Sequence, residues 1–183
     1  MKVLIRFAML VVIAISAADA RADDFVKPTV TAEIRLVDGF NDVATIGGTL
    51  RIVKAFVGTL TAHGYETYTS YLLPEKSGSA WQHVLIDLPD EDFPDFRTEE
   101  SADSTVQAIA VYRERNGAVY VVQAAKSGLK APDLYLKAAH VTFKVFRFNG
   151  NADVARFNQV AMFQSAAAYE DANDAITKEF FRK

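Results

Sequence analysis

Residues 106–125, VQAIAVYRERNGAVYVVQAA, decide the fold class of this chain. Two runs rich in β-branched and aromatic residues, Val106–Arg115 and Ala118–Ala125, lie on either side of Asn116-Gly117. Asn-Gly between such runs is the strongest short signal of a β-hairpin, because both central positions of a two-residue turn need a positive φ angle. The stretch therefore predicts a long antiparallel hairpin that turns at Asn116-Gly117.

Further strands are predicted on both sides of this hairpin. Downstream, Val141–Phe148 and Phe157–Phe163 flank the turn-forming residues 149–153 and predict a second hairpin. Upstream, a turn at Asp38-Gly39 and strand-forming composition predict four more strands, namely Val30–Leu36, Leu50–Leu60, Tyr65–Leu72 and Trp81–Leu88. Leu50–Leu60 is apolar on both faces apart from Lys54, which is typical of a central strand. We expect a mainly β (α+β) fold, an antiparallel sheet or sandwich.

One amphipathic helix is predicted at the C-terminal end. Tyr169, Ala172, Ile176 and Phe180 recur at helical spacing and form one apolar stripe. Ser165 is the expected N-cap, because a serine hydroxyl can accept a hydrogen bond from the first helical turn.

The N-terminal residues have the pattern of a secretory signal peptide. Lys2 and Arg6 border the apolar run Phe7–Ile15, and small residues suited to cleavage follow at Ala20 and Ala22. The apolar run is shorter than the roughly 18 residues that a transmembrane helix needs. We therefore expect residues 1–22 to be removed, and residues 23–183 to form one β-rich domain without a membrane anchor, in the periplasm or outside the cell.

Composition narrows the function classes. The chain has no cysteine, so neither a lipoprotein anchor nor a disulfide is expected. Half of its residues are apolar and the formal net charge is −3. An acidic chain without a basic tract argues against a nucleic-acid partner, whose binding depends on neutralising phosphates.

Acidic segments raise the question of calcium. The segment Pro89–Asp95 holds two prolines and four acids, and we expect a solvated irregular loop there. Both the run Asp87–Asp95 and the segment Asp38–Asp42 could supply oxygen ligands to calcium, but they lack the spacing and central glycine of an EF-hand. A solvated loop is favoured for both, and calcium binding by Asp87–Asp95 stays open.

The usual catalytic motifs are absent from the sequence, so we expect a protein that is not an enzyme and carries no cofactor. Ser127–Lys130 has the SxxK spacing of penicillin-recognising serine enzymes, and residues 126–128 mimic their KTG triad. One serine would have to serve both motifs in a loop, so the match is coincidental. The histidines form no HxH or HxxxH pair, and no metal site is predicted. His83 and His140 lie inside predicted strands, where a structural role is expected.

A ligand-binding site is hypothesised around one turn. His63 lies between two predicted strands, and turns at strand ends commonly carry function. Tyr65, Tyr68 and Trp81 are near in sequence. Core packing is favoured for aromatic residues on these strands, and Tyr68 and Trp81 are the ones expected to be partly exposed and available to a ligand. A second hypothesis is an envelope enzyme that uses His63 with an acid such as Asp103.

The order of features resembles one family. The matching residues are Val53-Lys54, Ala62–Tyr65, Tyr68, Tyr71, Trp81, Glu100–Asp103, a strand ending in Arg113, Val119–Lys126, Val141, Phe143, Phe146, Ser165, Tyr169, Ala172, Ala175 and Phe180. In this order, with the signal peptide and the chain length, they resemble the secreted carbapenem intrinsic and self-resistance proteins of the CarG and CpmJ type. The resemblance implies a periplasmic β-rich protein that protects its host without hydrolysing the drug, with a carbapenem or its target as partner. It implies no catalytic residues.

Overall fold

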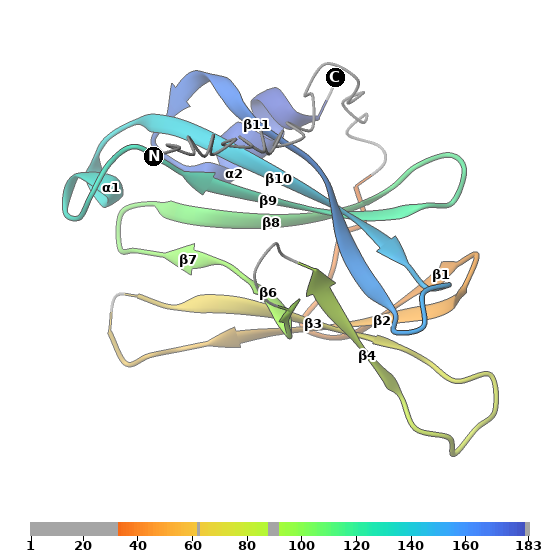
Figure 1. Cartoon of the computed structure of the whole chain (residues 1–183). Helices are drawn as coiled ribbons and strands as arrows, with labels where there is room; N and C mark the ends of the chain where they lie inside the picture. The colour runs from red at the N-terminus through yellow and green to blue at the C-terminus, as the bar shows by residue number, and fades with distance from the viewer. Residues whose placement is uncertain (1–32, 62, 88–91, 182–183) are drawn as a thin grey trace, which may run out of the picture.

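One curled β-sheet dominates the structure, a computed structural model that describes residues 33–61, 63–87 and 92–181. The predicted signal peptide lies outside the described residues. Figure 1 shows the sheet in two layers, with β1–β4 in the lower layer and β8–β11 in the upper one. The strands are β1 (Gly39–Thr45), β2 (Gly48–Val57), β3 (Tyr65–Leu72), β4 (Gln82–Asp87), β5 (Asp92–Phe93), β6 (Asp95–Arg97), β7 (Glu99–Glu100), β8 (Thr105–Arg113), β9 (Val119–Lys126), β10 (Ala139–Asn149) and β11 (Arg156–Tyr169).

The layers belong to one sheet because β4 pairs with β11. The strand order is β1-β2-β3-β4-β11-β10-β9-β8-β7, with β5 beside β4 and β6 beside β3. The pairing of β4 with β11 is parallel, whereas the other pairs are antiparallel. The mainly β prediction is confirmed, and the sheet is mixed rather than purely antiparallel.

The hairpin of residues 106–125 is present, but its turn differs from the predicted one. Gly117 N–H donates to the Glu114 carbonyl at 2.9 Å, and Glu114 N–H donates to the Ala118 carbonyl at 3.0 Å. Gly117 has a φ of 84°, whereas Asn116 is not among the residues with positive φ. This is the pattern of a three-residue loop closed by a left-handed glycine. The prediction that both turn residues have positive φ is wrong, because the loop is one residue longer.

The C-terminal helix is shorter than predicted. It consists of α2 (Ala172–Ala175) followed by the π-helical turn η3 (Ile176–Phe180). Asp171 is the N-cap and accepts a hydrogen bond from Asn173 N–H at 2.7 Å. Ser165 lies instead in β11, where its hydroxyl accepts from Val141 N–H at 2.9 Å. The expected cap is wrong because pairing with β10 keeps the chain extended as far as Tyr169. A one-turn helix that was not predicted, α1 (Asp133–Leu136), follows β9.

Two other strand predictions and one turn prediction need correction. Of Val30–Leu36, the first three residues lie outside the described residues, and Glu33 makes only an isolated bridge to Tyr112. Strand β1 begins at Gly39, where a turn was expected, because residues 39–45 pair with β2. β2 ends at Val57 and buries one face only, since Phe56 is 58% exposed.

The acidic segment is more regular than expected. Residues 88–91 lie outside the described residues. In the rest of the predicted irregular loop, β5 forms at Asp92–Phe93, and β6 begins at Asp95 and continues to Arg97. Asp95 pairs with Thr69 of β3, so the prediction of an irregular loop is wrong there. Pairing with an existing sheet edge overrides the local preference of prolines and acids for a loop.

Alternating residues of β10 bury two separate cores. Phe143 and Val145 face α2 and η3, in a core with Ala172, Ile176 and Phe180. Phe146 and Phe148 point between the two layers, because successive side chains of a strand point to opposite faces. This second core also holds three aromatic rings that join the two layers. The ring centroid of Phe96 lies 5.1 Å from that of Phe146 and 5.4 Å from that of Phe157.

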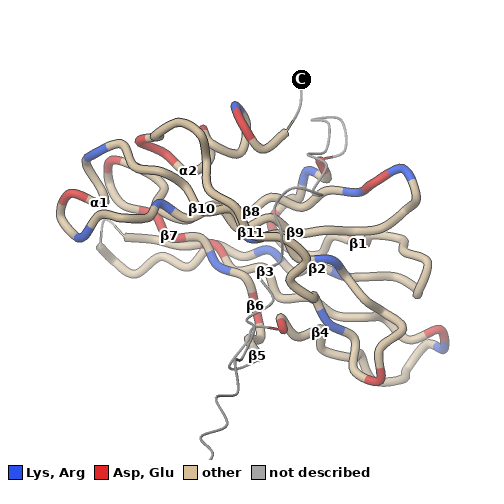
Figure 2. Tube along the Cα trace, turned by 45° about the horizontal axis from the view of Figure 1, so that its top comes forward, with Lys and Arg blue, Asp and Glu red and all other residues tan. Residues whose placement is uncertain are grey.

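Charged residues of both signs are interspersed around the two layers (Figure 2). Within the described part of the chain, no helix has the length and apolarity that a membrane crossing would need.

We expect Phe157→Ala to lower the free energy of unfolding by about 3–5 kcal/mol, because it removes a fully buried ring from the interlayer core. Urea unfolding followed by circular dichroism measures this. Met162→Ala on the same strand is the control, since Met162 is 51% exposed and its truncation should cost within about 0.5 kcal/mol. Equal effects of the two substitutions would contradict the described core.

We expect Gly117→Ala to destabilise the fold by about 1–2 kcal/mol, because a side chain is disfavoured in the left-handed region. Gly58→Ala is the matched control: its Cβ would meet the Phe56 ring at an ordinary 3.7 Å. A Gly117→Ala variant as stable as the control in the same urea experiment would show that the loop does not need the left-handed residue.

Candidate functional site

A row of polar and aromatic side chains crosses the outer face of the lower layer. Asp42 pairs with Arg51, Arg51 with Tyr71 and Tyr71 with His83 across four neighbouring strands. Arg51 donates to both carboxylate oxygens of Asp42 at 2.7 Å. This hydrogen bonding from Arg51 lowers the pKa of the Asp42 carboxyl. Asp42 and Arg51 therefore form an ion pair with two hydrogen bonds within this row.

Trp81 lies against the two middle residues of this row, Arg51 and Tyr71. Its ring centroid lies 4.7 Å from the Arg51 guanidinium carbon, and the Phe40 ring lies 4.8 Å from the same carbon. Trp81 is 45% exposed and Phe40 63% exposed. The expectation that Trp81 is partly exposed is confirmed, and the residue belongs to an open aromatic surface.

Tyr68 lies on the opposite face of β3, in the interlayer core. It is 7% exposed, so the expectation of partial exposure is wrong. Its hydroxyl donates to Glu66, which also binds Lys54 at 2.6 Å. Burial, followed by the hydrogen bond to Glu66, raises the pKa of Tyr68. The alternation of β3 places Tyr68 inward and Tyr65 outward.

His63 and Tyr65 share a shallow hollow of about 490 Å³. The His63 ring centroid lies 5.6 Å from that of Tyr135. The other lining residues are Thr59, Gly64, Arg97, Thr98, Glu99, Glu100 and Gln107. Asp103, the acid considered for catalysis with His63, is not among them. Trp81 and Tyr68 do not line it either, so the four candidate ligand residues do not form one site.

Each of the other two histidines is hydrogen-bonded to a backbone carbonyl, which is consistent with the structural role expected for them. His83 Nε2 is hydrogen-bonded to the Pro94 carbonyl at 2.9 Å, and His140 Nδ1 to the Ser165 carbonyl at 3.0 Å. Within the described ranges, no three His, Cys, Asp or Glu side chains gather closely enough to hold a metal ion. Calcium binding by Asp87–Asp95 is not tested, because Asp90 and Glu91 lie outside those ranges.

A deeper candidate site lies between the layers, next to the His63 hollow. We call it the interlayer cleft; its volume is about 460 Å³, within the range of small-molecule sites. It is lined by Ile86, Phe93, Pro94, Asp95, Phe96, Arg97, Gln107, Gln123, Lys144 and Phe146. Ile86, Phe96 and Phe146 are buried and form an apolar floor that continues into the interlayer core.

Polar groups surround this floor. Gln123 of β9 and Lys144 of β10 are direct cross-strand partners. Arg97 pairs with Asp95 at 3.2 Å, and its carbonyl accepts from the Gln107 amide at 2.7 Å. No described side chain forms an ion pair or hydrogen bond with Lys144 (among residues 33–61, 63–87 and 92–181). Lys144 therefore faces the cleft without a charge partner among the described residues.

This arrangement offers both apolar and charged contacts to a ligand. A compact apolar molecule with a carboxylate would place its body on the aromatic floor and its charge at Lys144, with the Gln123 amide beside it. None of the ten lining residues is a Ser, Thr, Cys or His, and the charged side chains among them are Asp95, Arg97 and Lys144. Sequence reasoning missed the cleft, although Lys144 interrupts an apolar strand and was a usable signal.

The fold and the cleft define a mainly β protein with a curled mixed sheet and a ligand-sized amphipathic site. No protein-family model matches the chain, and no curated protein matches it in sequence. A solved structure, the crystal structure of CarG, aligns with a TM-score of 0.64 and 16% identity, over 82% of this chain and 99% of CarG. The chain has the fold of CarG, and the resemblance inferred from its sequence is confirmed at the level of the fold.

Glu100, at the edge of the His63 hollow, gives a pH test of the site's electrostatics. Burial, and then the negative charge of Glu66, raise its pKa. A carboxyl with a raised folded-state pKa contributes stability below its unfolded pKa of about 4.3, and this is lost as pH rises through the folded value. We expect Glu100→Gln to raise the thermal midpoint at pH 7 and to change it little at pH 4.

Thermal unfolding followed by circular dichroism at both pH values checks this. Glu99→Gln is the matched control, because Glu99 is the exposed neighbour in the same strand and should change neither midpoint. A lower midpoint for Glu100→Gln at pH 7 would mean that the ionised Glu100 stabilises the hollow instead.

Proposed function

We propose that this protein is an exported carbapenem-resistance protein that acts by binding the drug and not by hydrolysing it. The observation that carries the proposal is the CarG fold, which extends over 99% of the CarG chain. The family resemblance of the sequence supports it independently. The signal-peptide pattern of residues 1–22 supports export, which would place the protein where a β-lactam meets its targets.

The interlayer cleft supports binding of this class of drug. A carbapenem is a compact bicyclic β-lactam with one carboxylate. The carboxylate would lie at Lys144, and the ring system on Phe96 and Phe146. A Lys–carboxylate pair at the edge of an apolar cleft is only partly screened by water, so it contributes more than a surface pair.

We expect a sensitive host to gain carbapenem resistance from the full chain but not from a variant that lacks residues 2–22. Minimum inhibitory concentration measures this, and drug remaining in the medium is followed by its absorbance. Resistance without drug loss supports the proposal. Loss of drug from the medium would point to an enzyme, and an unchanged inhibitory concentration for both versions would contradict a role in resistance.

We expect purified protein to bind a carbapenem, and Lys144→Met to weaken that binding about 10- to 100-fold, the effect of one charge-assisted hydrogen bond of about 1.5–3 kcal/mol. Titration calorimetry measures both. Lys137→Met is the control, because Lys137 is exposed and paired with Asp133 at 2.8 Å. Resistance by a protein that binds no drug would favour protection of the target.

A further inference from the structure

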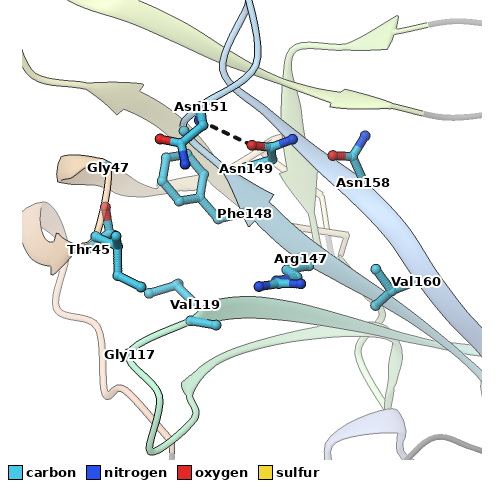
Figure 3. A pocket seen from close by; sticks show the side chains of 13 residues that line it. Thr45, Gly47, Gly117, Val119, Arg147, Phe148, Asn149, Asn151, Asn158 and Val160 are labelled. Atoms are coloured by element: carbon cyan, nitrogen blue, oxygen red, sulfur yellow. Dashed lines mark hydrogen bonds between the residues drawn. The ribbon is translucent and has the colours of Figure 1, made fainter.

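Another pocket lies where three hairpin ends meet (Figure 3). It shares no residue with the interlayer cleft. We call it the turn pocket; its volume is about 380 Å³. It is lined by Thr45, Ile46 and Gly47 of the β1–β2 end, by Gly117, Ala118 and Val119 of the β8–β9 end, and by Arg147, Phe148, Asn149, Gly150, Asn151, Asn158 and Val160 of β10, β11 and their turn.

Close backbone contact fixes one wall of the turn pocket. A Cβ added to Gly47 would lie 3.4 Å from Gly150 Cα, and one added to Gly150 would lie 3.0 Å from the Phe148 ring. The β1–β2 and β10–β11 turns therefore pack directly on each other. This contact between the two turns forms one wall of the pocket, so the wall is present without a ligand.

Arg147 is the single charged residue among those that line the turn pocket. It pairs in register with Tyr120 on one side and with Asn158 on the other. Its side chain is solvent-exposed. Over the described ranges, no hydrogen bond or ion pair joins its guanidinium to another residue. The planar guanidinium is thus available for two parallel hydrogen bonds to a carboxylate.

Amide groups surround Arg147. The Asn158 amide nitrogen donates to Asp87 at 2.8 Å, which leaves the Asn158 oxygen as an acceptor. The Asn149 oxygen accepts from Asn151 N–H at 3.1 Å, which leaves the Asn149 NH₂ group as a donor. Figure 3 shows Arg147 and Val160 at the same pocket, and Val160 is 45% exposed. One carboxylate, one amide and one small apolar group would find partners here.

We propose that the turn pocket binds the C-terminal end of a peptide. The terminal carboxylate pairs with Arg147, the last peptide bond with the asparagine amides, and the terminal side chain packs on Val160. A phosphate group suits the pocket less well, because a single cation accompanied by three neutral amides and an apolar wall matches a singly charged amide ligand. This inference goes beyond the proposed function and does not rest on it.

The test uses N-acetyl-alanyl-alanine with a free carboxylate, and the same dipeptide as its C-terminal amide, titrated into the mature chain by NMR. We expect the free acid to bind and the amide to bind at least 10-fold more weakly. Separate L,L and D,D forms of the acid distinguish the end of a protein chain from a cell-wall type of peptide. Binding by neither form, or equal binding of acid and amide, overturns the proposal.

Variants locate the site. Arg147→Gln should abolish binding of the free acid. Arg147→Lys should retain a weakened affinity, because lysine keeps the positive charge but cannot donate two parallel hydrogen bonds to a carboxylate. Arg115→Gln removes an exposed cation from the neighbouring turn that does not line the pocket, and should leave the affinity unchanged. Lys144→Met should also leave it unchanged. If Arg115→Gln or Lys144→Met abolishes binding and Arg147→Gln does not, the assignment of the site is overturned.

Discussion

The parallel pairing of β4 with β11 is the constraint on which the rest of the structure depends. Its three residue pairs, from Leu85↔Arg156 to Asp87↔Asn158, join the two layers into one sheet. The Asn158–Asp87 hydrogen bond of 2.8 Å strengthens the joint. Each layer alone is a set of antiparallel strands with an apolar face toward the other layer, and the upper layer also packs its second face on α2 and η3. Held together by this joint, the layers bury the Phe96–Phe146–Phe157 cluster and leave the interlayer cleft at its margin.

Strand β10 supplies the key cation of both pockets from its two opposite faces. Lys144 shares the inward face with Phe146, whereas Arg147 lies on the other face, three residues along. Opposite faces follow directly from the two-residue period of a strand. The strand therefore serves two chemically different sites: a flexible ammonium above an aromatic floor, and a planar guanidinium among amides.

The structure separates polar groups that hold the fold from polar groups that face a ligand site. Lys54 is mostly buried, yet Glu66 compensates its charge at 2.6 Å. Burial has the largest single effect on the pKa of Lys54 and lowers it, but the hydrogen bonds and charges of Glu66 and Asp38 together raise it more, so the net shift is upward. Arg51 is similarly compensated by Asp42. Lys144 and Arg147 have no such partner among the described residues, which is why the binding proposals rest on them.

The sequence by itself determined the features that depend on neighbouring residues. The strand predicted at Tyr65–Leu72 coincides with β3, and both long hairpins are present, because side-chain alternation and turn residues act over a few positions. Tertiary structure decided the rest. Pairing with β10 extended β11 past Ser165, the interlayer core buried Tyr68, and the curl of the sheet separated His63 from Trp81. Which face of a strand is covered depends on partners distant in sequence. Lys144 is visible in the sequence as a charge within an apolar strand, but only the tertiary structure places it and Arg147 at pockets.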